Sequence, residues 1–257
     1  MVLHAQEGLL TTSSVPAARV LVATAVPLER DAVARAFAPA PLREMPLPGA
    51  ALHRTGGYDL LAAGVGPARA AASTAAALTA AALADSPYDL VVSTGIAGGF
   101  QPEAPVGSLV VADEITVADL GAETADGFVT VTELGFGVVS HRPPESLVRE
   151  LAAAIGGHTG TILTVSTVTG TGARATELRA RHPRALAEAM EGFGVAEAAT
   201  AHGVPVLELR AVSNPVGPRD RAAWRIGEAL TALTEAFGKL APVLESWNPH
   251  EPYDHTR

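Results

Sequence analysis

Short apolar runs recur along the chain without alternating with polar residues. Runs of this kind predict β-strands that are buried on both faces, as in a parallel sheet covered by helices. They predict strands at residues 19–26, 58–64, 89–95, 108–117, 160–168 and 204–213. Two of these runs end in Gly, at Gly64 and Gly95, which favours a turn after the strand.

Segments rich in Ala and Leu separate the apolar runs and predict helices. The predicted helices lie at residues 29–37, 68–83, 144–155, 173–181, 185–202 and 221–241. Pro67 follows the turn Gly64-Val65-Gly66 and is typical of a helix start. Strands that alternate with helices predict an α/β fold, namely a three-layer α/β/α sandwich around a mixed, largely parallel sheet.

The composition is that of one large domain. Of the 257 residues, 48% are hydrophobic and 18% are charged, enough to bury a single large core. We expect a domain at residues 18–245 between flexible tails at 1–17 and 246–257. The net charge of −9 without a basic stripe argues against a nucleic-acid partner.

The sequence also argues against a membrane partner. The first 18 residues have no basic start followed by an apolar run, and the Ala-rich stretch 70–84 is too short to span a bilayer. The chain has no Cys, which excludes disulfides, thiolate metal sites and cysteine nucleophiles. We therefore expect a cytoplasmic protein.

Polar residues gather at the carboxyl ends of the predicted strands, where α/β sheets bind ligands. Glu29 follows the first strand, the glycine-rich segment 93–99 follows the third, and Arg210-Ala211-Val212-Ser213-Asn214 closes the last. Each also has a purely structural explanation. An acid favours the first turn of a helix, and glycines favour turns.

A carboxylate stands on an otherwise apolar predicted helix. Glu191, in Ala189-Met190-Glu191-Gly192, has no Lys or Arg within one helical turn. Burying it without a donor would cost several kcal/mol. A ligand with hydroxyl groups would satisfy it.

Five segments in this order and spacing resemble the nucleoside phosphorylase and nucleosidase superfamily over about residues 19–245. They are residues 25–29, the turn Gly64-Val65-Gly66, Ser93-Thr94-Gly95-Ile96-Ala97-Gly98-Gly99, residues 189–192 and residues 210–214. The similarity is to the branch that contains methylthioadenosine/S-adenosylhomocysteine nucleosidases and futalosine hydrolases. Residues 166–171 and 214–220 resemble the futalosine hydrolases in particular.

The resemblance implies roles for individual residues. Glu191 matches the acid that binds the ribose 2′- and 3′-hydroxyls, and Met190 matches a residue that packs against the sugar. Glu29 matches the carboxylate that deprotonates the attacking water, assisted by Arg210. Further positions that match substrate contacts are Ile96, Ala97, Gly98, Thr169, Gly170, Thr171 and Ser213.

Water is the expected nucleophile. Phosphate normally requires several Arg or Lys donors or a helix N-terminus around one point, and the phosphorolytic branch has an Arg where this chain has Ser93. Ile96 departs from the nucleosidase pattern, in which a Ser helps to hold the water. Backbone groups are the expected substitute there.

Asn214 indicates the leaving base. The adenine-specific nucleosidases have an Asp at this position that protonates N7. An amide cannot act as that acid, but its carbonyl can accept from N7–H while its NH₂ donates to O6. This pairing fits hypoxanthine. Asn before Pro215 is also a common turn former.

The resemblance places the 5′ substituent near Val65, Trp224 and the segment 120–136, with a neighbouring subunit of a homodimer or higher homo-oligomer closing the pocket. Futalosine carries a benzoate there, for which Arg219 and Arg54 are candidate cations. His53 and His141 have no ligand spacing, and we predict neither a metal site nor a cofactor.

The predicted activity is hydrolysis of the N-glycosidic bond of futalosine, a purine nucleoside, to hypoxanthine and dehypoxanthine futalosine in menaquinone biosynthesis. Two alternatives stay open. One is another nucleosidase or phosphorylase of this fold acting on inosine-like or methylthioadenosine-like substrates. The other is a nucleoside-binding module without turnover.

Overall fold

The computed structural model describes residues 18–247. The central strands are β1 (Val20–Thr24), β4 (Tyr58–Ala62), β5 (Leu90–Gly99), β6 (Leu109–Val117), β10 (His158–Thr164), β11 (Ala185–Ala189) and β12 (Val206–Pro215). The helices are α1 (Pro27–Arg35), α2 (Pro67–Leu83), α3 (Glu145–Ile155), α4 (Gly172–Arg181), α5 (Gly192–Ala201) and α6 (Ile226–Ser246). All six predicted strands are therefore present, and four predicted helices match closely in position, whereas α6 begins and ends five residues later than the helix predicted at 221–241.

The edge strands β2 (Arg43–Leu47) and β3 (Ala50–Thr55) and the short strand β9 (Ser140–His141) complete the sheet. The sheet is mixed and has ten strands in the order β11-β10-β6-β12-β5-β1-β4-β3-β2, with β9 beside β6. Parallel ladders join β1 to β4 and β5, β5 to β12, and β10 to β6 and β11. β11 also pairs with β5. The five strands from β11 to β5 thus close into a ring of hydrogen-bonded neighbours, a feature that the predicted sandwich did not include.

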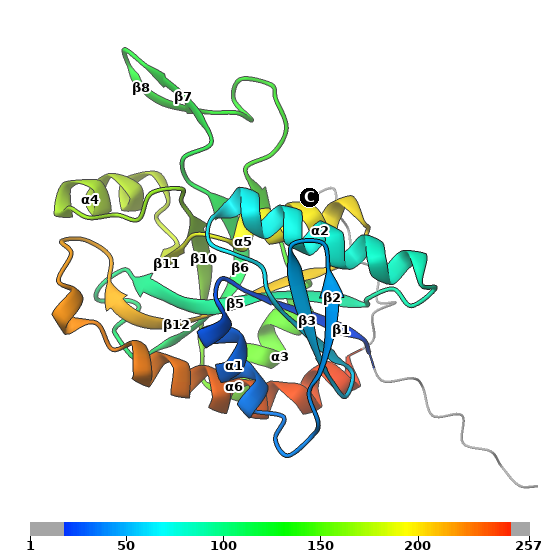
Figure 1. Ribbon diagram of the computed structural model, residues 1–257. Coiled ribbons are helices and arrows are strands. Elements are labelled where there is room, and N and C mark those ends of the chain that lie inside the picture. Colours follow the sequence, from blue (N-terminus) through cyan, green and yellow to red (C-terminus); the bar gives the residue numbers. More distant parts are fainter. Residues whose placement is uncertain (1–17, 248–257) are drawn as a thin grey trace, which may run out of the picture.

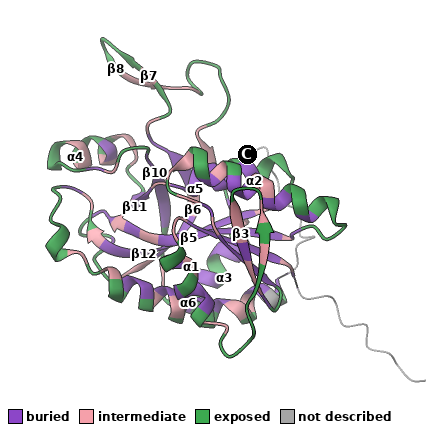
Figure 2. Ribbon diagram, in the orientation of Figure 1, coloured by how far each residue is buried: buried purple, intermediate pink, exposed green. Residues whose placement is uncertain are grey.

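Helices cover both faces of the sheet (Figure 1). Residues of α2 and α5 pack into one apolar cluster, and residues of α1, α3 and α6 pack into another on the opposite face. The strands between them are buried along most of their length (Figure 2), and β1 is buried at all five positions. The prediction of strands buried on both faces is confirmed.

The helix predicted at residues 185–202 is wrong in its first third. Residues 185–189 form β11, and α5 begins only at Gly192. The Ala-rich composition favours a helix locally, but the segment hydrogen-bonds to β10 and to β5. Tertiary pairing overrides the local preference there.

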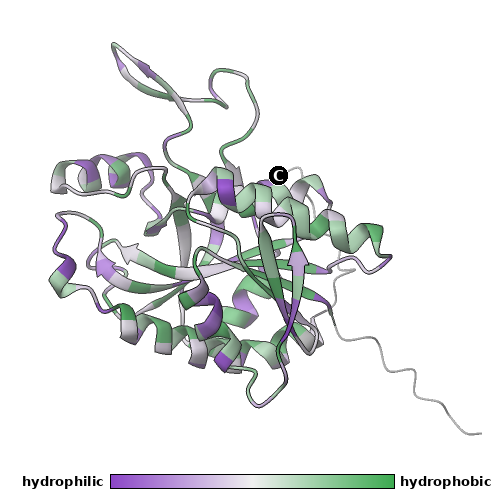
Figure 3. Cartoon of the chain, in the orientation of Figure 1, coloured by the Kyte–Doolittle hydropathy of each residue, from purple (hydrophilic) through white to green (hydrophobic). Residues whose placement is uncertain are grey.

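Short strands that the apolar pattern does not reveal add a meander and a hairpin. They are β2 (Arg43–Leu47), β3 (Ala50–Thr55), β7 (Gly121–Thr124) and β8 (Gly127–Thr130). β7 and β8 pair only with each other and stand away from the body (Figure 1). α4 also lies at the periphery and is largely hydrophilic (Figure 3), with only Leu178 buried.

The chain ends differ in part from the predicted domain limits. α6 continues through Ser246, so residues 246 and 247 of the predicted C-terminal tail are ordered with the domain. The rest of that tail and the predicted tail at residues 1–17 lie outside the described residues.

Candidate active site

A cavity of about 320 Å³ opens at the carboxyl ends of β1, β5, β11 and β12. This is the edge at which the sequence predicted a ligand site. Its lining comprises Ala25, Val26, Glu29, Val65, Ile96, Ala97, Gly98, Val168, Thr169, Glu188, Ala189, Met190, Glu191, Ser213, Asn214, Pro215, Val216, Gly217, Pro218, Arg219 and Trp224.

Glu29 is fixed at the start of α1 by three backbone donors. Its Oε2 accepts from the N–H groups of Ala25 (3.0 Å) and Val26 (3.3 Å), and its Oε1 accepts from Ile96 N–H (2.9 Å). Gly95 makes this approach possible, because its φ is +150° and a Cβ there would lie 2.6 Å from Glu29 Oε1. Burial raises the pKa of Glu29, although Arg210 nearby opposes the shift.

The side chain of Ile96 does not take the place of the water-holding Ser. It packs among the apolar residues between α1 and α6, while its backbone N–H binds Glu29. That N–H is thus committed to the predicted base, and the expected backbone contact to the attacking water stays a prediction.

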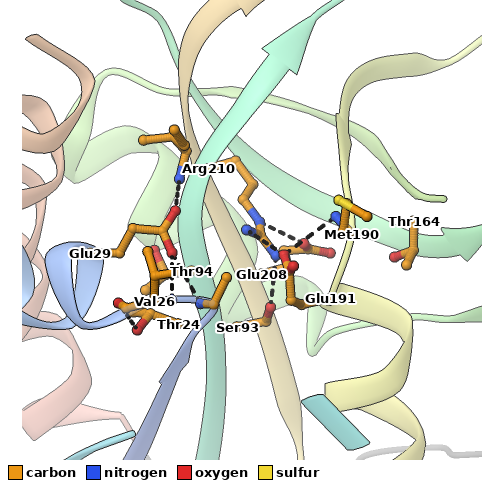
Figure 4. A network of polar contacts seen from close by, with 12 residues as sticks. Thr24, Val26, Glu29, Ser93, Thr94, Thr164, Met190, Glu191, Glu208 and Arg210 are labelled. Carbon is orange, nitrogen blue, oxygen red and sulfur yellow. Dashed lines mark hydrogen bonds and ion pairs between the residues drawn. The ribbon is translucent and has the colours of Figure 1, made fainter. Parts of the chain in front are cut away.

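Arg210 is a buried guanidinium among acids (Figure 4). Nε donates to Glu208 Oε1 (2.8 Å), Nη1 donates to Glu191 Oε2 (3.4 Å), and Nη2 donates to Ser93 Oγ (3.2 Å). Its buried neighbours Glu208, Glu191 and Glu29 raise the pKa of Arg210 against the effect of burial. Arg210 is therefore a fixed positive charge.

The sequence predicted that Glu191 lies on a helix without a hydrogen-bond donor, and this prediction is wrong. It follows β11 at the N-cap of α5, and its carboxylate accepts from Gly66 N–H (3.2 Å), Met190 N–H (3.3 Å) and Arg210. Gly66 and Arg210 are remote in sequence, so local inspection could not find them. The carboxylate still lines the cavity and can accept further hydrogen bonds.

Two buried acids of the site, Glu188 and Glu208, were missed. Glu188 lines the cavity and is held by Thr169, whose N–H donates to Oε1 at 2.8 Å. Glu208 lies behind Arg210 and is fully buried. The signal was available for Glu208, which interrupts a predicted apolar strand in Leu207-Glu208-Leu209, but not for Glu188, which lies in a segment predicted to be helical.

Burial raises the pKa of Glu208 to about 7, with Arg210 opposing the shift. The folded protein therefore holds a proton on Glu208 that the unfolded chain releases above the ordinary glutamate pKa of 4.5. The stabilisation from this proton is complete below pH 4.5 and is lost as the pH rises to about 7.

We expect Glu208→Gln to flatten the fall in unfolding free energy between pH 4.5 and 7. One proton difference corresponds to a slope of roughly 1.4 kcal/mol per pH unit. Urea unfolding across this range measures the slope. The control is Glu123→Gln, a change at an exposed position of β7. It should leave the slope of the unfolding free energy against pH as in the unmodified protein. Equal slopes in all three proteins would contradict the assignment.

Ser213 and Asn214 form the opposite end of the cavity. A register shift in β12 beside Ser213 brings Asn214 opposite Gly98 of β5. Ser213 Oγ donates to Asn214 Oδ1 (2.8 Å), and Asn214 Nδ2 donates to Pro215 O (3.0 Å). The amide is therefore held with a free lone pair on Oδ1 and a free hydrogen on Nδ2.

The structure brings most of the predicted site residues together. Lining the cavity with Glu29, Glu191 and Asn214 are Met190, Ile96, Ala97, Gly98, Ser213, Val65, Thr169, Trp224 and Arg219. Arg210 lies behind the cavity, in contact with Glu191. Arg219 lies 5.6 Å from the ring centre of Trp224, so the two form one wall.

Other predicted residues lie elsewhere. Thr171 caps α4 by accepting from Arg174 N–H, and Gly170 adjoins Arg219 outside the cavity lining. Arg54 on β3 is bound to Asp59 (2.7 Å), so it is not a cation of this cavity. The segment 120–136 includes β7 and β8 and does not line the cavity of its own chain.

His53 and His141, which have no ligand spacing in the sequence, both lie on strands. His141, on β9, contacts Glu197 at 2.7 Å, and His53, on β3, is 3.9 Å from Glu44. Between residues 18 and 247, no group of three His, Asp or Glu side chains is placed to hold a metal. Within the same range, no helix has the length and apolar character needed to cross a membrane.

Comparisons with known proteins agree with this geometry. The family model for the phosphorylase superfamily matches residues 21–245. The chain is 78% identical to futalosine hydrolase from Streptomyces coelicolor over 90% of this chain and 98% of that protein. It is 35% identical to futalosine hydrolase from Thermus thermophilus, over 72% of this chain and 81% of that one.

Solved structures with lower identity share the fold. A methylthioadenosine nucleosidase variant from Helicobacter pylori, with 5′-methylthioadenosine in its active site, superposes with a TM-score of 0.74 at 19% identity, covering 88% of this chain and 99% of that one. Futalosine hydrolase from the same organism gives 0.73 at 19% identity over 87% and 97% of the two chains.

Proposed function

The chain belongs to the phosphorylase superfamily, and from this premise we propose that it hydrolyses the N-glycosidic bond of futalosine. The products are hypoxanthine and dehypoxanthine futalosine, a step of menaquinone biosynthesis. The observation that carries the proposal is one cavity with Glu29 and Glu191 at one end and Asn214 at the other. The high identity to a futalosine hydrolase supports the choice of substrate.

Glu191 binds the ribose. Its carboxylate accepts from the 2′- and 3′-hydroxyls, and Met190 packs against the sugar ring. As the glycosidic bond breaks, the sugar gains positive charge, which the carboxylates of Glu191 and Glu29 stabilise. Glu29 takes a proton from the attacking water and directs the water oxygen to the anomeric carbon.

The charge of the site favours water over phosphate as the nucleophile. Arg210 is already bound to Glu208, Glu191 and Ser93, so its charge is balanced by buried acids. Arg219 is the cation that lines the cavity in the described part of the chain, and it lies with Trp224. A phosphate beside Glu29 would meet more negative than positive charge.

Asn214 recognises the departing base. The base leaves with the electron pair of the broken bond and takes its N7 proton from solvent, because an amide cannot supply one. The lone pair left on Oδ1 accepts from N7–H, and the hydrogen left on Nδ2 donates to O6. A 6-aminopurine presents a donor at position 6 and mismatches the amide. The base is therefore a 6-oxopurine.

Replacing Asn214 with aspartate should raise the kcat/KM ratio of aminodeoxyfutalosine to futalosine at least about tenfold, because a carboxylate accepts from the 6-amino group but not from O6. Purine release from each substrate measures the ratio. Asn214→Ala, which loses contact with both bases, is the matched control. An unchanged ratio in Asn214→Asp would mean that this residue does not read the base.

The 5′ substituent lies along Val65 and Trp224, where an indole face suits its aromatic ring. Arg219 binds the benzoate carboxylate. Its position over the ring of Trp224, 5.6 Å from the ring centre, and at the cavity wall supports this role.

The protein acts as a cytoplasmic homodimer. The projecting arm, residues 120–138, exposes large apolar side chains: Leu120, Leu134, Phe136 (72% exposed) and Val138. A cluster of this kind on a segment that leaves the body is typical of an interface. A second copy would cover it and complete the wall around the 5′ substituent.

Incubation with futalosine, inosine and aminodeoxyfutalosine, each with and without phosphate, tests the proposal by purine release. We expect hypoxanthine release from futalosine that does not depend on phosphate. Strong phosphate dependence would favour a phosphorylase, and preference for the amino substrate would favour an adenine nucleosidase. Binding without any base release, unaffected by Glu29→Gln, would indicate a nucleoside-binding module.

A further inference from the structure

Glu208 is a fully buried acid that the mechanism above does not use. It does not line the cavity, so it cannot touch a substrate directly. Burying a carboxylate is costly, so its presence behind the site needs an explanation. Any part that it plays in the reaction must pass through the two groups that it contacts, which are the guanidinium of Arg210 and the backbone at Gly192.

The first contact sets the position of the Arg210 guanidinium (Figure 4). Glu208 and Arg210 are two residues apart on β12, so their side chains leave the same face of the sheet. Glu208 Oε1 accepts from Nε at 2.8 Å, whereas the bonds to Ser93 and Glu191 are 3.2 and 3.4 Å long. Because the guanidinium is rigid and planar, a fixed Nε also fixes the direction of the Nη1 group that binds Glu191.

The second contact lies at the start of α5. A Cβ at Gly192 would overlap both carboxylate oxygens of Glu208. Gly192 is the first residue of α5 and does not have a positive φ, so the space taken by Glu208, rather than the backbone conformation, accounts for the glycine. Glu191 is the N-cap of the same helix. Glu208 therefore supports Glu191 in two ways, through Arg210 and through the adjoining backbone.

Arg210 needs an acceptor at a fixed place, and this acceptor does not have to be charged. In the described part of the chain, Glu208 Oε2 makes no hydrogen bond. Burial raises the pKa of Glu208 to about 7, and a proton on Oε2 leaves the bond from Nε to Oε1 intact. Glu191 and Glu29 also balance the charge of Arg210. A neutral polar side chain of the same shape should therefore keep the guanidinium in place, whereas an apolar one should release it.

Glu191 has to be held within narrow limits to bind two adjacent hydroxyls of a ribose. A misplacement of about 1 Å at such a contact can cost on the order of 10²-fold. Two backbone N–H groups, of Gly66 and Met190, bind the carboxylate at 3.2 and 3.3 Å. Arg210 is the side chain that holds it from behind the cavity.

We propose that Glu208 is a positioning residue for recognition of the sugar: it holds Arg210 and the start of α5 so that the carboxylate of Glu191 faces the ribose 2′- and 3′-hydroxyls. This inference rests on the proposed function, since it assumes a ribonucleoside in the cavity. Glu208 touches no substrate, so its replacement should change binding of the sugar only through Glu191.

Nucleoside binding without turnover tests the assignment. Dissociation constants for inosine and 2′-deoxyinosine are measured by calorimetry on Glu29→Gln, which lacks the general base, and on the same protein with Glu208→Leu or Glu208→Gln added. In Glu208→Leu we expect the preference for inosine to fall by about tenfold or more. Glu208→Gln keeps an acceptor for Nε, so it should largely retain the preference.

Gly192→Ala disturbs the same contact without removing the carboxylate. The added methyl group displaces Glu208, so it should also lower the preference for inosine. Gly172→Ala is the matched control, because Gly172 is the first residue of α4 and has open space where its Cβ would lie. It should leave the preference unchanged. If Glu208→Leu does not fold, Gly192→Ala decides the question by the same measurement.

A double-mutant cycle separates positioning of Glu191 from general support of the fold. If Glu208 acts through Glu191, Glu208→Leu weakens inosine binding in Glu29→Gln but has little effect when Glu191→Gln is also present. Equal weakening in both backgrounds overturns the proposal, and so does equal weakening of inosine and 2′-deoxyinosine. A Glu29→Gln protein without any preference for inosine overturns it too, because there is then no sugar contact to position.

The same proteins distinguish this inference from the proposed function. Futalosine hydrolysis by the unmodified protein, together with a preference for inosine that Glu208→Leu leaves unaltered, rejects the role of Glu208 and leaves the activity standing. Absence of futalosine hydrolysis, together with a preference that falls in Glu208→Leu and persists in Glu208→Gln, rejects the substrate and supports the role of Glu208.

Discussion

Replacing Glu29 with glutamine should lower kcat for futalosine hydrolysis by about 10²–10⁴-fold. Glutamine keeps the length of the side chain, and its carbonyl can still accept from Ile96 N–H. It cannot take a proton from water. Steady-state release of hypoxanthine measures kcat, and binding of free hypoxanthine should be unchanged because Asn214, the proposed contact of the base, lies at the other end of the cavity.

Asp31→Asn is the matched control, since Asp31 is exposed on the same helix. It should retain full activity. The pH profile gives a second check. Because burial raises the pKa of Glu29, and the base must be ionised to act, activity should begin to fall on the acid side at a higher pH than an ordinary glutamate would cause. A loss of less than tenfold in Glu29→Gln would exclude Glu29 as the general base.

Replacing Glu191 with glutamine should lower kcat/KM by about 10²–10³-fold. The change removes the charged acceptor for the ribose hydroxyls and one negative charge beside the sugar cation. It also leaves Arg210 with one fewer ion-pair partner. Comparison of inosine with 2′-deoxyinosine isolates the contact to the sugar.

The unmodified protein should prefer the ribonucleoside, and this preference should largely disappear in Glu191→Gln. Glu197→Gln, a change of a half-exposed acid on the same helix, should keep it. If Glu191→Gln retains the preference for inosine, the sugar hydroxyls are bound by another group.

Much of the fold could be predicted because burial leaves a plain signal in strands. A strand covered on both faces has no polar alternation, and each of the six apolar runs is a strand in the structure. The strand β11 was not predicted, because its sequence Ala-Leu-Ala-Glu-Ala favours a helix. Its pairing with β5 and β10 is a long-range property that no local window contains.

The candidate site was predictable to the extent that it lies at strand ends. Glu29, Glu191 and Asn214 could be selected in this way, and the structure places all three on one cavity. The partners of Glu191 were not predictable, because Gly66 and Arg210 approach it only through packing of distant elements. Glu208 could have been found from the sequence as an acid within a predicted apolar strand, whereas Glu188 falls in a segment that the sequence predicted to be helical.

The single guanidinium among buried acids has a consequence for inhibitor chemistry. Arg210 faces Glu191 and Glu208 directly, and Glu29 is close by, so the cavity end proposed to bind the sugar offers excess negative charge. A compound with a protonated amine in place of the anomeric carbon would complement that charge permanently, whereas the substrate does so only at the moment of bond cleavage. Compounds with sulfate or phosphate at the same position would be repelled, so useful ligands for this enzyme will be cations at the sugar and neutral at the base.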